Sequence, residues 1–346
     1  MRVKRKGPLL IAVTMGDPAG IGAEVIVKAA GARRERRGAP SMVVIGDLGV
    51  MRETSRRLRS RCAVRRWQPG EPIATLSEAL PVLAASELSA TARHPGRPSV
   101  AGAHAAYDYI MRGAQMAMRG EVDALVTGPI SKEWMNRAGH RYPGQTEVLA
   151  GLAKVRLFRM MFAGDALKLA LVTVHIALAD VPAAINVKNV LDTIRLLARH
   201  LRECHGLARP RIGVLGLNPH AGEHGLFGDE ERRAIAPAVR RAGREGIDAF
   251  GPLAPDSAFL RTQGGFRFDA AVAMYHDQGL IALKTLEFDR AVNVTLGLPF
   301  IRTSPDHGTA FEIAGSAAAR PSSMIAALEY AGRAAMMRAT AERHAA

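Results

Sequence analysis

The sequence of 346 residues predicts an α/β protein whose sheet is largely parallel. Short, β-rich apolar runs alternate with longer segments in which apolar residues recur at steps of three and four. A strand followed by a helix, repeated along the chain, is typical of parallel sheets with helical crossovers. The hydrophobic fraction is 48%, so the chain can bury a large core, and its length favours two lobes over one small domain.

Six apolar runs predict buried strands: residues 9–14, 42–45, 123–127, 167–174, 211–217 and 270–274. The clearest predicted helix runs from Ala103 to Met118, where apolar residues follow the helical period. Gly120 comes directly after this segment and predicts its C-terminal end.

The charge of the chain is strongly positive and unevenly distributed. The net charge is +15, and residues 1–67 hold 16 Lys and Arg against 5 Asp and Glu, a net +11. This asymmetry allows a basic nucleic-acid-binding or sensory protein. The basic runs Arg33–Arg37 and Arg56–Arg66 contain no aromatic residues and match no helix-turn-helix or RNA-binding signature. We therefore favour a solvated arginine-rich surface that attracts anionic metabolites, and we expect no nucleic-acid partner.

The N-terminal charge order and the cysteine content bear on the compartment. Met1–Lys6 is basic and an apolar stretch follows, but this stretch is short and runs into Gly16, so we interpret it as a first strand with a basic lead-in. No segment approaches the roughly 20 apolar residues of a membrane span. Cys62 and Cys204 are the two cysteines, which rules out a disulfide framework. We expect a cytoplasmic protein without a membrane partner.

Three histidines follow predicted strands: His175, His220 and His276. The carboxyl ends of parallel strands gather at one edge of a sheet, where ligands bind, so these residues could converge despite separations of 45 and 56 residues. Three imidazoles suit zinc or a similar divalent ion and leave a coordination position open for a substrate oxygen. For each histidine alone, a hydrogen-bonded loop residue is the alternative. We interpret His224 as a surface residue.

Two other segments could contact ligands. The turn from Gly16 to Gly22 follows the first strand, and its glycines would let backbone amides approach an anion. Its spacing is not the Gly-x-Gly-x-x-Gly fingerprint, and a tight structural turn is the alternative. The segment from Lys284 to Gly315 combines cations, amides and small residues, which suits carboxylate and phosphate groups. Simple exposure of Lys284 and Arg302 is the alternative there.

Together these motifs resemble the 4-hydroxythreonine-4-phosphate dehydrogenase family, the PdxA type of pyridoxal phosphate biosynthesis. The resemblance covers nearly the whole chain, and its motifs span residues 14–22, 127–132, 218–223, 274–279 and 293–315. It implies a fold similar to isocitrate and isopropylmalate dehydrogenases, with a homodimer and an active-site cleft between two lobes. We expect residues 1–128 and 300–346 to form the first lobe, on the cofactor side. Residues 129–299 would form the second lobe, with the metal, substrate and dimer contacts.

The resemblance also implies roles for individual residues. The metal ligands are His175, His220 and His276; the substrate contacts are Gln145, Thr146, Lys284, Asn293 and Arg302. Lys132, Asp256 and Asp277 are candidates for proton transfer or for orienting ligands. A looser match assigns the cofactor to Gly16, Asp17, Gly20, Gly22, His307, Gly308, Thr309 and Ala310. The cofactors implied are NAD or NADP and a divalent metal, namely zinc, magnesium or cobalt.

The implied reaction is oxidation of 4-phosphooxy-L-threonine with decarboxylation to 3-amino-2-oxopropyl phosphate. One position departs from the family pattern, since Gln145 stands where most members have histidine in Gly-His-Thr-Glu. Glutamine can donate a hydrogen bond but cannot become cationic, which would change an anion contact. D-threonate or D-erythronate 4-phosphate, the substrates of related catabolic branches, are therefore the alternative, while a more distant branch acts on a cyclic diol dicarboxylate.

Overall fold

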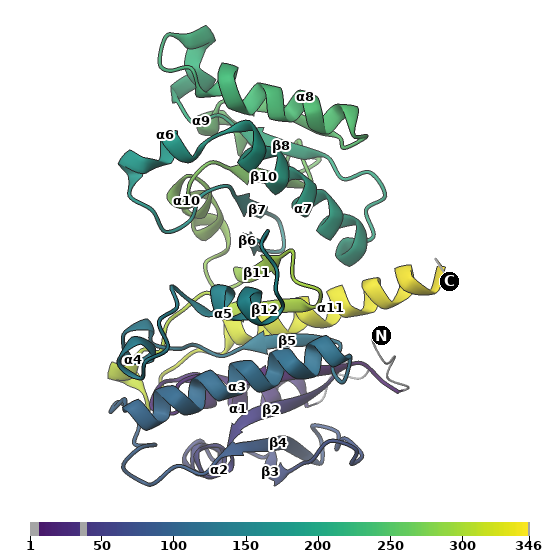
Figure 1. Ribbon diagram of the computed structural model, residues 1–346. Helices are drawn as coiled ribbons and strands as arrows, with labels where there is room; N and C mark the ends of the chain where they lie inside the picture. The colour runs from purple at the N-terminus through teal and green to yellow at the C-terminus, as the bar shows by residue number, and fades with distance from the viewer. Residues whose placement is uncertain (1–6, 35–39, 345–346) are drawn as a thin grey trace. The chain divides into compact units, whose positions relative to one another are not determined.

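The computed structural model describes residues 7–34 and 40–344 (Figure 1). The basic lead-in Met1–Lys6 and residues 35–37 of the first basic run lie outside the described residues. The chain divides into two compact units: unit 1 comprises residues 1–156 and 298–336, and unit 2 comprises residues 157–297 and 337–346. Residues 129–156 group with unit 1, because the two helices they form pack against a long helix of that unit.

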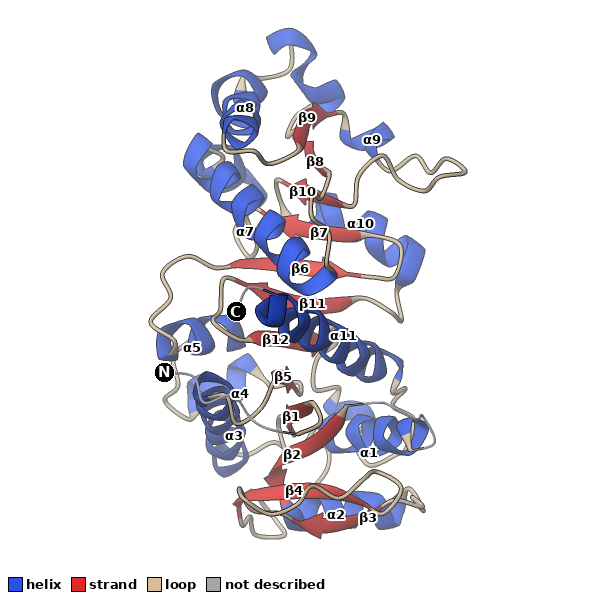
Figure 2. Cartoon of the chain, turned by 90° about the vertical axis from the view of Figure 1, so that its right-hand side faces the viewer, coloured by secondary structure: helices blue, strands red, loops and turns tan. Residues whose placement is uncertain are grey.

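Unit 1 is built on six parallel strands in the order β3-β4-β2-β1-β5-β12. Its strands are β1 (Leu10–Thr14), β2 (Ser41–Asp47), β3 (Ala63–Arg66), β4 (Ala79–Ser86), β5 (Ala124–Thr127) and β12 (Ile301–Pro305). Its helices are α1 (Gly22–Arg33), α2 (Leu48–Arg57), α3 (Val100–Arg119), α4 (Lys132–Arg137), α5 (Gln145–Leu152), the 3-10 turn Phe311–Ile313, and α11 (Ser322–His344), whose last residues belong to unit 2. Figure 2 shows α1 and α3 on opposite sides of these strands.

Strands β1 and β5 of unit 1 are buried on both faces, which explains their uninterrupted apolar runs. Every residue of β1 is buried, and Ile11 pairs with both Met42 of β2 and Ala124 of β5. The predicted helix is confirmed as α3, which ends at Gly120 with a left-handed φ of 75°. Glycine is favoured at this C-terminal position because it adopts a positive φ without steric penalty.

Unit 2 has six strands in the order β11-β6-β7-β10-β8-β9. They are β6 (Arg159–Ala163), β7 (Lys168–Leu171), β8 (Ile212–Leu215), β9 (Ala249–Leu253), β10 (Ala270–Ala273) and β11 (Val292–Leu296). The pairs β7–β10, β10–β8 and β8–β9 are parallel, while β6 is antiparallel to both β7 and β11.

The helical elements of unit 2 cover both sides of its strands, with α7 and α10 on opposite sides in Figure 2. They are the 3-10 turn Leu178–Asp180, α6 (Val181–Ala184), α7 (Val187–His205), the turn Pro219–Gly225, a π turn (Glu231–Ile235), α8 (Ala236–Arg244), α9 (Pro255–Ala258) and α10 (His276–Glu287). A Cβ at Gly279 would lie 3.1 Å from Leu169 and 3.2 Å from Ala273. Glycine at this position therefore allows α10 to lie close to β7 and β10.

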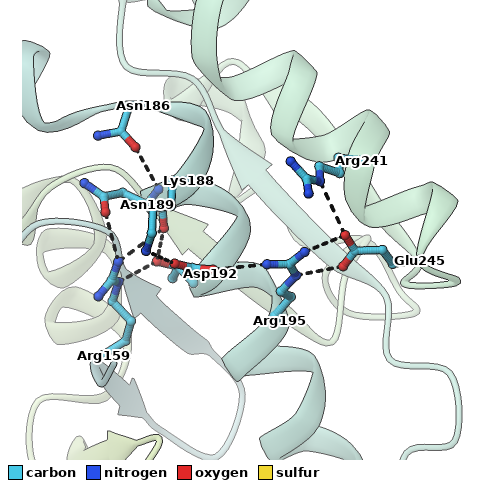
Figure 3. A network of polar contacts seen from close by, with 9 residues as sticks. Arg159, Asn186, Lys188, Asn189, Asp192, Arg195, Arg241 and Glu245 are labelled. Carbon is cyan, nitrogen blue, oxygen red and sulfur yellow. Dashed lines mark hydrogen bonds and ion pairs between the residues drawn. The ribbon is translucent and has the colours of Figure 1, made fainter. Parts of the chain in front are cut away.

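A network of charged side chains joins α7 to the rest of unit 2 (Figure 3). Arg195 of α7 donates two hydrogen bonds to Glu245, at 2.7 and 2.6 Å, and one to Asp192 at 3.2 Å. Arg159 of β6 donates to the Thr193 hydroxyl at 2.8 Å. These contacts connect α7 with β6 and with the residue that follows α8.

The predicted α/β class with a largely parallel sheet is confirmed, and each of the six predicted strands is present. The strands that the sequence did not predict are β3, β4, β6, β9, β11 and β12. Within residues 7–34 and 40–344, no helix combines the length and apolar character of a membrane span.

Candidate active site

The three candidate metal ligands follow three neighbouring parallel strands of unit 2. His175 comes four residues after β7, His276 is the first residue of α10 after β10, and His220 lies five residues after β8. Because β10 lies between β7 and β8, all three residues are at the carboxyl edge of one parallel sheet.

His175 and His276 lie close enough together to share one ion, since their ring centroids are 5.8 Å apart. An imidazole nitrogen binds zinc at about 2.0–2.1 Å, so two rings on one ion have centroids at most about 6.4 Å apart. Nδ1 of His276 lies 2.6 Å from Oδ1 of Asp277, which favours the tautomer with hydrogen on Nδ1 and a lone pair on Nε2. In the described part of a single chain, however, no group of three or more His, Cys, Asp or Glu is arranged to hold a metal ion. His220 therefore does not join this pair there.

His220 lies in a turn with an unusual backbone. Residues 220–224 all have positive φ, between 41° and 79°, and Gly222 is the one glycine among them. A left-handed conformation costs about 1–2 kcal/mol for each non-glycine residue. Such strain persists where the surrounding structure holds it, and it clusters at functional sites.

Two side chains that hold this edge together had no role assigned from the sequence. Glu231 accepts hydrogen bonds from the amides of Leu217 and Asn218, at 2.7 and 2.8 Å, just before the left-handed turn. Gln278 accepts from the Met274 amide and donates to the Gly216 carbonyl, both at 2.7 Å, so it joins the ends of β10 and β8. Gln278 lies in the motif 274–279, which was a signal in the sequence; Glu231 had none.

The acidic candidates Asp256 and Asp277 are both exposed. Asp256 lies in α9, which packs against the turn Pro219–Gly225 that carries His220. Asp277 follows His276 and its side chain is 73% exposed. Asp256 is therefore near the turn of His220, and Asp277 contacts the ring of His276.

Two candidate substrate contacts of unit 2, Lys284 and Asn293, come after His276 in the sequence. Lys284 lies on α10, two helical turns after His276, with Nζ 5.8 Å from the ring centroid of Phe288. Asn293 lies on β11, and its Oδ1 is buried with no hydrogen-bond partner among the described residues. A buried acceptor of this kind is rare in folded proteins, and a ligand that donates a hydrogen bond would satisfy it.

In unit 1, a buried arginine is the centre of a second group of candidate residues. Arg302 of β12 is 3% exposed and donates to the Thr127 hydroxyl through Nε and Nη2, at 3.2 and 2.7 Å. Its Nη2 also lies 3.4 Å from Oε1 of Gln145, whose Nε2 donates to the Gly128 carbonyl at 2.9 Å. Burial lowers the pKa of Arg302 to about 10, although Glu147 opposes this, so the guanidinium remains cationic at neutral pH.

Two further candidates are Thr146, which lies on α5 beside Gln145, and Lys132, which begins α4. Thr146 is the second residue of α5 and is buried. Lys132 begins α4 and is exposed, and a Cβ at Gly144 would lie 3.7 Å from its Cε. The stem of Lys132 therefore lies next to the residue before Gln145.

The two candidate cofactor segments of unit 1 lie side by side. The Ile21 amide donates to the Thr309 carbonyl at 3.0 Å, and Gly20 packs against Thr309. Gly16 has a φ of 78°, and a Cβ there would collide with the Pro129 carbonyl, as would one at Gly22 with the Met15 carbonyl. These glycines are required for the close approach of backbone segments.

Four amides of the turn already have acceptors within the protein. Those of Asp17, Ala19, Gly20 and Ile21 donate to Pro129 O, Asp17 Oδ1, Asp17 O and Thr309 O, respectively. These four amides are therefore not available to bind a ligand, and the turn would contact one mainly through its surface. In the other segment, Nδ1 of His307 contacts the Gly308 carbonyl, and its buried Nε2 has no hydrogen-bond partner among the described residues. Gly308 is exposed, and Ala310 has a positive φ of 42°.

Histidines at the carboxyl edge of a parallel sheet, together with a buried arginine in unit 1, are typical of α/β enzymes that bind small anionic ligands. The family model of the "Pyridoxal phosphate biosynthetic protein PdxA" matches residues 39–331, and the chain belongs to this family.

Curated relatives and solved structures agree with the family. The chain is 47% identical over 330 residues to the 4-hydroxythreonine-4-phosphate dehydrogenase of Trichlorobacter lovleyi, covering 95% of this chain and 98% of the relative. It is similar to the crystal structure of 4-hydroxythreonine-4-phosphate dehydrogenase from Klebsiella pneumoniae, with a TM-score of 0.85, 40% identity and coverage of 95% and 100%. A terephthalate 1,2-cis-dihydrodiol dehydrogenase from Burkholderia xenovorans is more distant, with a TM-score of 0.67, 28% identity and coverage of 94% and 98%.

Proposed function

We propose that this protein is an NAD(P)-dependent, divalent-metal-assisted dehydrogenase that oxidises 4-phosphooxy-L-threonine, with decarboxylation to 3-amino-2-oxopropyl phosphate. The names of its close relatives support the reaction. The observation that carries the proposal is the pair of imidazoles of His175 and His276, 5.8 Å apart at the carboxyl edge of unit 2. His220 follows β8 at the same edge but does not join the pair within the described part of one chain, so we propose that a second copy of the chain in the homodimer supplies it as the third ligand.

The side chains at this edge have the donor chemistry that zinc, cobalt or magnesium sites use, with neutral imidazole best suited to zinc and cobalt. A metal held by these histidines would lower the pKa of the substrate hydroxyl, and a bound nicotinamide would accept the hydride released from the same carbon. Asp277 fixes the tautomer of His276 through the 2.6 Å contact with Nδ1. Lys132 and Asp256 are the proposed groups for proton transfer.

The proposed substrate contacts are Thr146, Lys284, Asn293 and Arg302. Arg302 supports a phosphorylated substrate, because a buried guanidinium pairs strongly with phosphate oxygens. Gln145 is the reason for the alternative of D-threonate or D-erythronate 4-phosphate, because a neutral amide beside Arg302 offers hydrogen bonds in place of a cationic contact and so changes which substrate groups fit there.

The proposed NAD or NADP contacts are the turn Gly16–Gly22 and the segment His307–Ala310. Their direct contact through Ile21 and Thr309 supports a shared role. Because four amides of the turn already have acceptors, we propose that the turn mainly shapes the surface. The unpartnered Nε2 of His307 is the proposed polar contact.

We also propose a cytoplasmic homodimer. Ile176 and Leu178 follow His175, and Leu226 and Phe227 follow the turn of His220; all four are exposed, Leu226 by 73%. Large exposed apolar side chains on loops that follow two strands of one edge favour an interface, and a second copy of the chain is the proposed occupant. A cytoplasmic location agrees with both cysteines being free thiols. Analytical ultracentrifugation of the full chain tests the dimer, and a purely monomeric protein would refute it.

The test of the metal site uses His220→Ala and His276→Ala, with His224→Ala as the matched control, because His224 lies in the same left-handed turn. We expect the first two variants to lose bound Zn²⁺ and to lower kcat/KM by at least about 100-fold with unchanged circular dichroism. The control His224→Ala should retain bound Zn²⁺ and the kcat/KM of the parent. Full activity of either variant, or of chelated protein, would reject the metal site.

The test of the substrate is a panel of 4-phosphooxy-L-threonine, D-threonate 4-phosphate and D-erythronate 4-phosphate with NAD and with NADP. Fastest turnover of the first compound supports the leading proposal, and fastest turnover of either other compound supports the alternative. No turnover, no bound metal and strong salt-dependent binding of DNA or RNA would instead support a basic nucleic-acid-binding protein.

A further inference from the structure

The left-handed turn that carries His220 is held from one side by a single buried carboxylate. Oε1 of Glu231 accepts from the amides of Leu217 and Asn218, at 2.7 and 2.8 Å, and Oε2 accepts from Nδ2 of Asn218 at 2.9 Å. Glu231 is 6% exposed. Three donors from residues 217 and 218, three and two residues before His220, therefore converge on one carboxylate.

The backbone of the turn is shaped around this carboxylate. A Cβ at Gly222 would lie 2.7 Å from Oε2 of Glu231, and one at Gly216 would lie 3.1 Å from Oε1. Gly222 also has a φ of 79°, so glycine is required there for its conformation as well as for space. The backbone at Gly216 and at Gly222, on either side of His220, can thus approach Glu231 closely because glycine has no side chain.

The neighbouring acid, Glu230, makes a different set of contacts. Its Oε2 accepts from Nδ2 of Asn218 at 2.8 Å, but its other oxygen pairs with Arg233 at 3.2 Å. Neither oxygen contacts the backbone before the turn. Glu230 and Glu231 therefore share Asn218, and Glu231 alone of the two binds the amides that lead into the turn.

We propose that Glu231 is a positioning residue, whose carboxylate holds the turn that presents His220 and so sets the affinity for the divalent metal. This inference rests on the proposed function, in which His220 is a ligand. Glu231 acts through the turn, because both of its oxygens are buried and accept hydrogen bonds from residues 217 and 218. Groups that orient the ligands of a metal commonly change its affinity 10- to 100-fold, by order of magnitude.

The test is Glu231→Gln in the full chain after chelation. The new amide can still accept through Oε1, but its NH₂ group would face the NH₂ group of Asn218, so two donors would meet. We expect the Kd for Zn²⁺, measured by competition with a chromophoric chelator, to rise at least about 10-fold. Hydrogen exchange of the amides of Leu217 and Asn218 should also accelerate, because the two facing donors push the side chain away and weaken its contacts with these amides.

The matched control is Glu230→Gln, which changes the adjacent acid and the same Asn218 contact but leaves the backbone amides paired. Its Kd for Zn²⁺ should stay within about 2-fold of the parent value. Gly222→Ala approaches from the other side, because its Cβ would press on Oε2 of Glu231, and it should weaken Zn²⁺ binding even if Glu231→Gln fails to fold.

The outcomes separate this inference from the proposed function. If His220→Ala weakens Zn²⁺ binding and both Glu231→Gln and Gly222→Ala bind like the parent, the positioning role is refuted and the metal site stands. If His220→Ala itself binds Zn²⁺ like the parent, the proposed ligand set fails, and the positioning role fails with it. Equal weakening in Glu230→Gln and Glu231→Gln would also refute the specific role of Glu231.

Discussion

The carboxyl group of Asp17 should make unit 1 less stable as the pH rises. Asp17 is 2% exposed, and one hydrogen bond to its carboxyl comes from the Ala19 amide. Burial raises its pKa from 3.8 to about 6, and the Ala19 amide offsets this in part. Between these pH values the folded protein holds a proton that the unfolded chain releases, so the free energy of unfolding falls as the pH rises.

The magnitude follows from the shift. The difference between a pKa of 3.8 in the unfolded chain and about 6 in the folded protein corresponds to about 3 kcal/mol of unfolding free energy. This stability is lost between about pH 4 and pH 6. Asp17→Asn keeps an oxygen that can accept from Ala19 but carries no charge. The stability of this variant relative to the parent should therefore rise by about 3 kcal/mol between pH 4 and pH 8.

The assay is urea unfolding followed by tryptophan fluorescence. The chain has two tryptophans, Trp67 and Trp134, and both lie in unit 1 together with Asp17. Asp256→Asn, which removes an exposed carboxylate of unit 2, is the control and should show no such pH-dependent gain. A stability difference between Asp17→Asn and the parent that stays constant from pH 4 to pH 8 would refute burial as the cause.

Two further predictions concern single polar side chains. Gln145→His should change the relative kcat/KM values across the phosphorylated substrates more than it changes the KM for the nicotinamide cofactor. The reason is that the new side chain lies beside Arg302 and can become cationic. Unchanged relative kcat/KM values would count against a substrate contact at this position. Burial lowers the pKa of His200 to about 3, so the unfolded chain binds a proton below pH 6.5 that the folded protein excludes. The parent should therefore lose about 1–2 kcal/mol more than His200→Gln between pH 7 and pH 5, by urea unfolding and circular dichroism, and equal losses would contradict this.

The sequence predicted the buried strands best. Ile11, Ala12 and Val13 form an uninterrupted apolar run because parallel strands are covered on both faces, and β1 has this environment. By contrast, β3 reads Ala-Val-Arg-Arg and is mostly exposed at one end of the strand order, so it lacks an apolar signal. Helix α3 could be delimited because Gly120 marks its end by a local backbone requirement.

The candidate site was predictable in outline only. Placing His175, His220 and His276 after strands requires only local patterns, and the expectation that they share one edge follows from parallel topology. Which rings lie together depends on strand order and on loop conformation, and this is how His175 and His276 come to be 5.8 Å apart. The role of Glu231 depends on a left-handed turn that no apolar periodicity encodes.

The order of the strands in unit 2 bears on how this protein folds. β7, β10 and β8 are neighbours, yet β8 begins 41 residues after β7 ends and β10 begins 55 residues after β8 ends. Bringing such segments together requires closing long loops before any pairing can compensate for the lost chain entropy, and proteins rich in non-local pairs fold slowly. The carboxyl edge of β7, β10 and β8, where the three histidines lie, should thus form late during refolding, after the local helices have formed.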